Sequence, residues 1–79
     1  SKQHSDPFFN LGELNDSLPT PLTDAEYEVL LILSEGLTNE QIAHTRHLSV
    51  NTIKTHLKNI YAKLGVRSRT QAVQKIMRV

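Results

Sequence analysis

The segment from residue 49 to residue 64 carries the side chains best suited to chemistry in this 79-residue chain. Its polar residues supply ammonium, hydroxyl and amide groups, which donate hydrogen bonds to anions. Drawn as a helix at about 100° per residue, the segment places Asn51, Thr55 and Lys58 on its outer face, with Thr52 and Lys54 on the two shoulders. Small side chains let such a helix enter a groove about 12 Å wide, where lysines reach guanine O6 and N7. The pattern favours contact with duplex nucleic acid, although a plain solvated helix face has a similar composition.

The charge is divided unevenly along the chain. Residues 1–40 contain all eight acidic residues and one lysine, a net charge of −7, whereas residues 41–79 contain eight basic residues and no acid, a net charge of +8. A surface without carboxylates does not repel phosphates, so this division favours a nucleic-acid partner. The alternative is a dipolar surface whose acidic half folds back on the basic half.

The composition disfavours several classes of function. A single small domain leaves little room for an enclosed catalytic pocket, and the sequence shows no nucleophile–base pair and no glycine-rich phosphate loop. We therefore expect neither an enzyme nor a cofactor. The chain has no cysteine, and His44 and His47 share a helix face without a third ligand, so we expect no metal site. No apolar run approaches the roughly 20 residues that cross a bilayer, and no signal-peptide pattern follows Ser1, which favours a cytoplasmic fragment of a longer protein.

Helix start and stop signals predict an all-α domain over residues 22–79. Four residues have the type and position of helix N-caps, and the first two of them open capping boxes: Thr23, Thr38, Ser49 and Ser68. Gly36 and Gly65 supply left-handed stops. These signals predict a four-helix bundle with short connections, and no segment alternates with the period of two that marks a strand.

Residues 1–21 show little periodicity, and Pro19 and Pro21 disfavour helix at the residues before them. We predict that this segment is a flexible linker or the end of a missing upstream domain. Four of its apolar side chains could instead cap the domain or belong to that neighbour: Phe8, Phe9, Leu11 and Leu14.

The second and third predicted helices, 38–46 and 49–64, are joined by a tight turn. The longer one has a narrow apolar stripe that we assign to the core: Val50, Ile53, Leu57, Ile60 and Leu64. Two helices joined in this way form a helix-turn-helix, whose second helix enters the major groove of DNA. We therefore predict that helix 49–64 is the recognition helix.

The spacing of residues from Leu22 to about Met77 resembles the LuxR/FixJ-type helix-turn-helix family. The matching residues are Leu22-Thr23, Glu26, Val29-Leu30, Gly36, Asn39, Gln41-Ile42-Ala43, Ser49, Thr52-Ile53-Lys54, His56, Lys63-Leu64-Gly65-Val66, Arg69 and Gln71-Ala72-Val73. The block Thr52-Ile53-Lys54-Thr55-His56 with Asn59-Ile60-Tyr61 is most similar to the large ATP-dependent maltose-regulator type, with response-regulator output domains close behind.

The resemblance implies a DNA-binding output domain of a bacterial transcription regulator, with its regulation located in an upstream domain. Bases are expected to meet Lys54, Thr55, Lys58 and, from its place on the outer face, Asn51. The DNA backbone is expected to meet Asn39, Thr52, Lys63, Arg67 and, as a weaker candidate that could be structural, Arg69. RNA polymerase is a further expected partner. The alternative function is a protein–protein interaction module whose acidic and basic halves dock other proteins.

The last predicted helix has more apolar residues than one packed side needs. Part of its stripe must close the core, and the remainder is a candidate dimer face: Val73, Ile76 and Met77. One recognition helix covers too few base pairs for selectivity within a genome, so we expect a homodimer on DNA. Two positions stay open: Glu26 caps Thr23 and could also pair with Arg67 or Arg69, and Leu31 could contact another domain or subunit.

Overall fold

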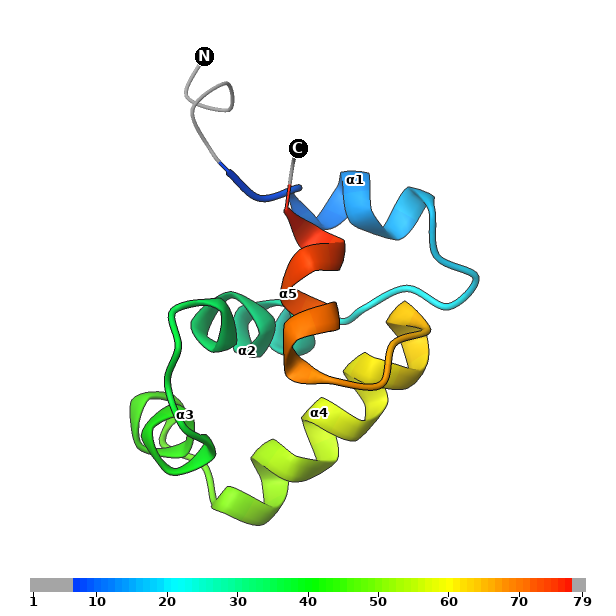
Figure 1. Cartoon of the computed structure of the whole chain (residues 1–79). Helices are drawn as coiled ribbons and strands as arrows, with labels where there is room; N and C mark the ends of the chain where they lie inside the picture. The colour runs from blue at the N-terminus through cyan, green and yellow to red at the C-terminus, as the bar shows by residue number, and fades with distance from the viewer. Residues whose placement is uncertain (1–6, 78–79) are drawn as a thin grey trace.

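The computed structural model describes residues 7–77, which form five α-helices and no strand. The helices are α1 (Leu11–Asp16), α2 (Asp24–Ser34), α3 (Asn39–Arg46), α4 (Val50–Leu64) and α5 (Arg69–Ile76) (Figure 1). The prediction of an all-α domain is confirmed, and the four helices expected from the sequence correspond to α2–α5. Helix α1 precedes them and was not expected.

The helices begin where the capping signals predict. Thr23 Oγ1 accepts the Glu26 N–H at 3.1 Å while Glu26 Oε1 accepts the Thr23 N–H at 3.0 Å, which closes the first capping box. Thr38 and Gln41 form the second box in the same reciprocal way. The two serine caps accept the N–H three residues later, at the starts of α4 and α5. Each cap satisfies a backbone donor that the first turn of a helix leaves without a partner.

The turn of the helix-turn-helix is built by His47, for which the sequence predicts no such role. Gly36 and Gly65 have φ of 88° and 72°, as their assignment as stops requires, but α3 ends at His47 with φ of 57°. The His47 N–H donates to the His44 carbonyl at 3.2 Å, and the Leu48 N–H donates to the Ala43 carbonyl at 2.9 Å. These two bonds satisfy the last carbonyls of α3 and reverse the chain into α4.

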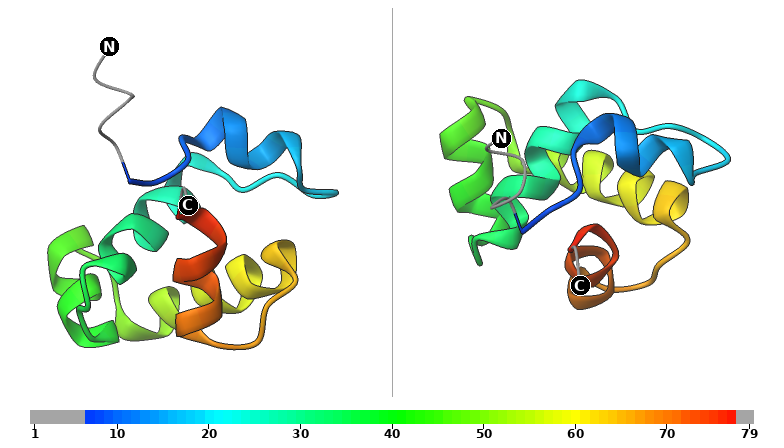
Figure 2. Two further views of the ribbon diagram at one scale, coloured as in Figure 1. Left: turned by 45° about the horizontal axis from the view of Figure 1, so that its top comes forward. Right: turned by 90° about the horizontal axis from the view of Figure 1, so that it is seen from above.

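The core lies where α4 crosses between α2, α3 and α5 (Figure 2). Its buried apolar residues are Leu14, Leu22, Val29, Leu30, Leu33, Ile42, Ala43, Ile53, Leu57, Ile60, Leu64, Ala72 and Ile76. Four of the five residues predicted as the stripe of the recognition helix are among them; the fifth, Val50, is half-buried. Burial of this stripe dictates which face of α4 points away from the protein.

The segment before α2 packs on the domain. A capping box opens α1: Asn10 Oδ1 accepts the Glu13 N–H at 2.8 Å, and Glu13 Oε1 accepts the Asn10 N–H at 3.0 Å. Leu14 is 3% exposed, so this part of the segment caps the domain. The sequence signal for α1 is the pair Asn10 and Glu13, which forms a capping box. Pro19 and Pro21 disfavour helix only near residues 18–21, so they do not exclude a helix at residues 11–16. A linker or upstream-domain role for residues 1–21 stays a prediction, and residues 1–6 lie outside the described part.

Candidate nucleic-acid interface

Four predicted base contacts lie together on the outer side of α4. Asn51, Lys54, Thr55 and Lys58 are all exposed, whereas Ile53 on the opposite side is fully buried. The arrangement follows from the helical repeat, because residues that are one and two positions away from a buried residue turn toward solvent. One helix surface therefore presents two ammonium groups, an amide and a hydroxyl with no carboxylate beside them on α4.

The hydroxyl groups on this helix are held by local hydrogen bonds. Thr55 Oγ1 donates to the Asn51 carbonyl at 3.1 Å. Ser49 Oγ accepts the Thr52 N–H at 3.1 Å and lies 2.9 Å from Thr52 Oγ1. Each hydroxyl oxygen keeps an acceptor lone pair, and the contacts fix the rotamers of the side chains at the start of α4.

An open cleft of about 540 Å³ borders the exposed face of α4. Side chains from four helices line it: Leu33, Asn39, Lys54, Leu57, Lys58, Tyr61 and Arg69. Its floor is apolar, and exposed Lys54 and Lys58 stand beside Asn39 at the start of α3. The fold thus brings two predicted backbone contacts, Asn39 and Arg69, and two predicted base contacts to a single concave surface.

Arg69 has a structural role in this cleft. Its Nη2 donates to the Leu33 carbonyl at 3.4 Å and also to the Leu37 carbonyl. These carbonyls lie at the end of α2 and in the loop after it, where a helix leaves acceptors without intrahelical donors and where a cation is favoured. Arg69 is also the weaker candidate for a contact with the DNA backbone. That contact would compete with the hydrogen bonds to these two carbonyls.

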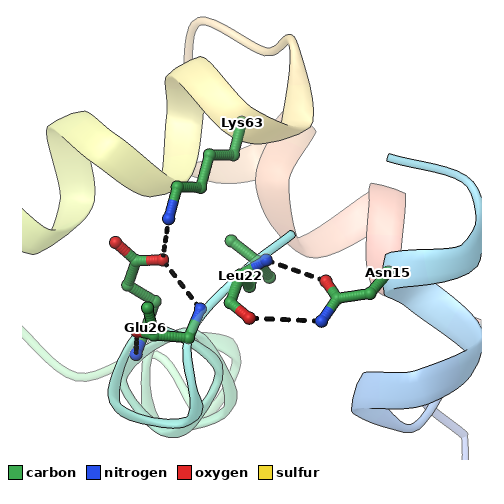
Figure 3. A network of polar contacts seen from close by, with 5 residues as sticks. Asn15, Leu22, Glu26 and Lys63 are labelled. Atoms are coloured by element: carbon green, nitrogen blue, oxygen red, sulfur yellow. Dashed lines mark hydrogen bonds and ion pairs between the residues drawn. The ribbon is translucent and has the colours of Figure 1, made fainter. Parts of the chain in front are cut away.

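Lys63 is bound to Glu26 rather than pointing freely into solvent. Lys63 Nζ lies 2.7 Å from Glu26 Oε1, and the two side chains are 20% and 6% exposed (Figure 3). The sequence left open a pairing of Glu26 with Arg67 or Arg69, and the structure shows Lys63 as its partner instead. This ion pair competes with the phosphate contact predicted for Lys63, because the ammonium is already paired with a buried carboxylate.

Burial acts to raise the pKa of the Glu26 carboxyl, but the hydrogen bond from Lys63, the N–H of Thr23 and the positive charge of Lys63 outweigh it. The net result is a pKa below the ordinary value of 4.5. Glu26 is therefore an ionised carboxylate at neutral pH, and Lys63 is its counter-ion.

The candidate dimer face is smaller than the sequence indicated. Ile76 is fully buried in the core, so its inclusion is corrected. Val73 is half-buried, and Met77 is 41% exposed. Met77 directly follows α5 and is one of two large apolar residues classed as exposed among residues 7–77, together with Leu48.

Residues 7–77 contain neither a metal-binding cluster nor a membrane-spanning helix. No cluster of three or more His, Cys, Asp or Glu side chains is placed to hold a metal ion in this part of the chain. None of its helices has the length and apolar character of a membrane span.

The match to known proteins agrees with this geometry. The family described as "Bacterial regulatory proteins, luxR family" matches residues 20–76, which include the helix-turn-helix and the cleft. The chain belongs to the luxR family. As the helix-turn-helix domain of that family, it is a DNA-binding output domain of a bacterial transcription regulator.

Relatives of this luxR-family domain include response regulators. Response regulator protein VraR of Staphylococcus aureus (strain Mu3) is 48% identical over 52 residues, which are 66% of this chain and 25% of the relative. The same protein of Staphylococcus saprophyticus matches equally well. The chain thus spans about a quarter of the length of these relatives. Of the two subgroups that the sequence resembles, these relatives represent the response regulators.

Solved structures of response regulators share the fold. The ComA DNA-binding domain, solved in complex with the anti-activator RapF, gives a TM-score of 0.67 at 42% identity and covers 68% of this chain and 93% of the solved one. Response regulator ChrA of a heme-sensing two-component system gives a TM-score of 0.70 at 40% identity, over 82% of this chain and 32% of the solved one.

Proposed function

We propose that α4 enters the major groove of double-stranded DNA and that Lys54 and Lys58 contact base edges, with Asn51 and Thr55 beside them. The observation that carries this assignment is the joint exposure of both lysines on the cleft. They are one helical turn apart, and the core contacts of Ile53 and Leu57 hold that face outward. Lysine donates to guanine O6 and N7, so each of the two lysines is suited to a base edge in the groove.

The backbone contacts that we propose are fewer than the sequence implied. Asn39 at the start of α3, Thr52 at the start of α4 and exposed Arg67 before α5 remain in the set. Asn39 and Thr52 lie in first turns, where free N–H groups and the helix dipole favour phosphate. Lys63 and Arg69 leave the set because their cationic groups serve Glu26 and the end of α2.

The cleft supports the same proposal. A sugar-phosphate strand offers apolar deoxyribose together with anionic phosphate, and the cleft offers an apolar floor beside Asn39, one of the proposed backbone contacts. A backbone strand lying there would place its bases against the outer face of α4. The proposal requires a cytoplasmic location, where bacterial DNA is found, and action by binding rather than by catalysis.

Amide NMR shifts on titration with a 20-base-pair duplex of mixed sequence at low salt test this interface. Non-specific binding is strong enough for the experiment, with a Kd of about 10⁻⁴–10⁻⁶ M. We expect the shifts to cluster at Asn39 and over residues 51–58. Shifts confined to α2, which carries Asp24, Glu28 and Glu35, would overturn the assignment.

We further propose that two copies pair on DNA through the exposed end of α5. A single recognition helix contacts too few base pairs to select one site among roughly 10⁶–10⁹ competitors. A second copy on an adjacent half-site makes the second contact intramolecular and raises the affinity. Half-sites about 10 base pairs apart place both recognition helices on one side of the duplex.

The protein-interaction alternative has one specific observation in its favour. The DNA-binding domain of the solved ComA structure is bound by an anti-activator protein. We propose as a second function that a protein partner occupies this domain and excludes DNA. Repeating the duplex titration at several salt concentrations tests the DNA-binding function, because DNA binding weakens by about 0.9 log units per neutralised phosphate for each tenfold rise in salt. RNA polymerase stays a predicted partner.

A further inference from the structure

The segment before α2 is docked on the end of α5 by backbone hydrogen bonds. Phe8 and Met77 form an antiparallel bridge, and the Phe9 N–H donates to the Ile76 carbonyl at 2.8 Å. The hydroxyl of Tyr27 on α2 donates to the Phe9 carbonyl at 2.6 Å. Residues 8–18, which we call the arm, therefore begin beside the end of α5 (Figure 1).

The arm is tied to the domain at its other end by one side chain. Asn15 Nδ2 donates to the Leu22 carbonyl at 3.1 Å, and Asn15 Oδ1 accepts the Leu22 N–H at 2.8 Å (Figure 3). Between the two attachments, only Leu14 is fully buried among the apolar residues, since Leu11 and Leu18 are half-buried. The arm is thus held by these hydrogen bonds, by buried Leu14 and by half-buried apolar side chains that pack against the core: Phe8, Phe9, Leu11 and Leu18.

This attachment is weaker than that of the other helices. Helix α1 has six residues, fewer than any of α2–α5. It contributes one buried residue, whereas each of α2–α5 contributes at least two. Segments with few buried contacts and exposed hydrogen bonds open at lower free energy than the core. We therefore expect the arm to undock at a lower free energy than that which opens the core.

The arm docks beside the surface of α5 through which we propose that two copies pair. Phe8 faces Met77 across the bridge, and Val73 lies one turn earlier on α5. A second copy that approaches α5 along Val73 and Met77 meets Phe8. Undocking removes Phe8 from beside Met77, which is 41% exposed in the docked state, and frees the Ile76 carbonyl, which the Phe9 N–H occupies while the arm is docked.

We propose that the arm is a releasable autoinhibitory contact: docked, it keeps the domain unpaired, and released, it opens the end of α5 to a second copy of this chain. The inference rests on the proposed pairing through α5. The arm directly precedes the DNA-binding helices, so any domain joined on its N-terminal side acts first on the arm. A change in that domain reaches α5 through Phe8 and Phe9 without passing through α4.

A release variant tests the inhibition. The release variant combines two substitutions. Phe9→Pro removes the N–H that donates to the Ile76 carbonyl, and Asn15→Ala removes both hydrogen bonds to the Leu22 backbone. Asp16→Ala with Thr20→Ala, at exposed positions of the same region, is the matched control. The probe is a duplex with two half-sites selected from a random pool by the unmodified chain. We expect at least about fivefold greater cooperativity in the release variant, with equal affinity for a single half-site.

Three outcomes separate the ideas. Cooperativity no greater than that of the control, in a protein whose α4 amides remain protected from exchange, overturns the autoinhibitory role. Loss of α4 protection in the release variant overturns it as well, because the arm is then an essential part of the fold. Failure of the control to bind a single half-site overturns the proposed function and leaves the docking of the arm as a property of the monomer.

Amide hydrogen exchange of the unmodified chain supplies an independent measurement. We expect the Phe9 N–H, which is bonded to Ile76, to exchange much faster than the amides of Ile53 and Leu57 in α4. Equal protection at these positions means that the arm opens only with the whole domain, which contradicts release.

Discussion

Lys63 Nζ lies 2.7 Å from Glu26 Oε1 and joins the last turn of α4 to the first turn of α2. Glu26 is 5% exposed and also accepts the N–H of Thr23, so one carboxylate starts α2 and holds α4 against it. The orientation of the face that carries Lys54 and Lys58 therefore depends on an ion pair on the other side of the same helix.

Lys63→Met should destabilise the fold more than it weakens DNA binding. The change leaves the Glu26 carboxylate buried without its cation, and we expect the free energy of unfolding at pH 7 to fall by about 1–3 kcal/mol; the partial exposure of Lys63 keeps the loss below that of a fully buried pair. Urea unfolding measures it, with Lys75→Met at an exposed position as the control. A variant with unchanged stability and a salt slope for DNA shallower by about one would restore Lys63 as a phosphate contact.

The pair predicts a stability that falls in acid. The pKa of Glu26 is lowered on folding, so the carboxylate stabilises the native state above its ordinary pKa of 4.5, and this contribution is lost as the pH falls below 4.5 and through the lower folded value. Urea unfolding at several pH values from neutral into acid should show the decline. Glu26→Gln should be less stable at pH 7 and lose part of the decline, whereas Glu28→Gln, exposed on the same helix, should keep it. An identical slope in Glu26→Gln and the unmodified chain would contradict the assignment.

Lys54→Ala and Lys58→Ala should each cost about 1–3 kcal/mol in binding to a duplex selected by the unmodified chain, and should relax the preference at one base pair. The physical reason is the loss of donors to a base edge, which a different base cannot replace. Titrations of the selected duplex and a scrambled duplex at several salt concentrations measure both effects. Equal losses on the two duplexes would show that these lysines hold phosphates instead.

His47→Gly should stabilise the protein by about 0.5–1 kcal/mol. His47 has φ of 57°, a left-handed conformation that side chains with a Cβ adopt at a cost of roughly 1–2 kcal/mol and that glycine adopts freely. Part of the gain is offset by the greater entropy of glycine in the unfolded chain. Thermal unfolding measures the change, and His44→Gly, inside α3, is the control that should destabilise. A loss of stability at position 47 would show that the imidazole makes a contact worth more than the strain.

Met77→Glu should abolish cooperative filling of a duplex with two half-sites while single-site affinity and helix content stay unchanged. A carboxylate at the centre of a paired apolar surface is desolvated without a partner. Titration of one-site and two-site duplexes gives the comparison, and Gln74→Glu, exposed on α5, tests charge alone. Unchanged cooperativity in a folded Met77→Glu variant would move the dimer face elsewhere, with Leu31 as the next candidate.

Local signals in the sequence determined most of the helices and the outward face of α4. Capping at Thr23, Thr38 and Ser49 involves residues three positions apart, so the information lies within one turn of chain. The stripe of Ile53 and Leu57 likewise follows from helical periodicity alone, and with it the exposure of Lys54 and Lys58. These features could be predicted because neither depends on how the helices pack.

Tertiary structure alone decided the roles of cations that are equivalent in the sequence. Lys63 and Lys58 are both lysines of one helix, but only packing places Lys63 against a carboxylate that lies 37 positions earlier in the chain. Arg69 is directed to the end of α2 for the same reason, across 36 positions. Ile76 and Met77 are adjacent apolar residues, of which the fold buries one and exposes the other. The distinction arises because burial and ion pairing are set by neighbours that are remote in sequence, and no local pattern records them.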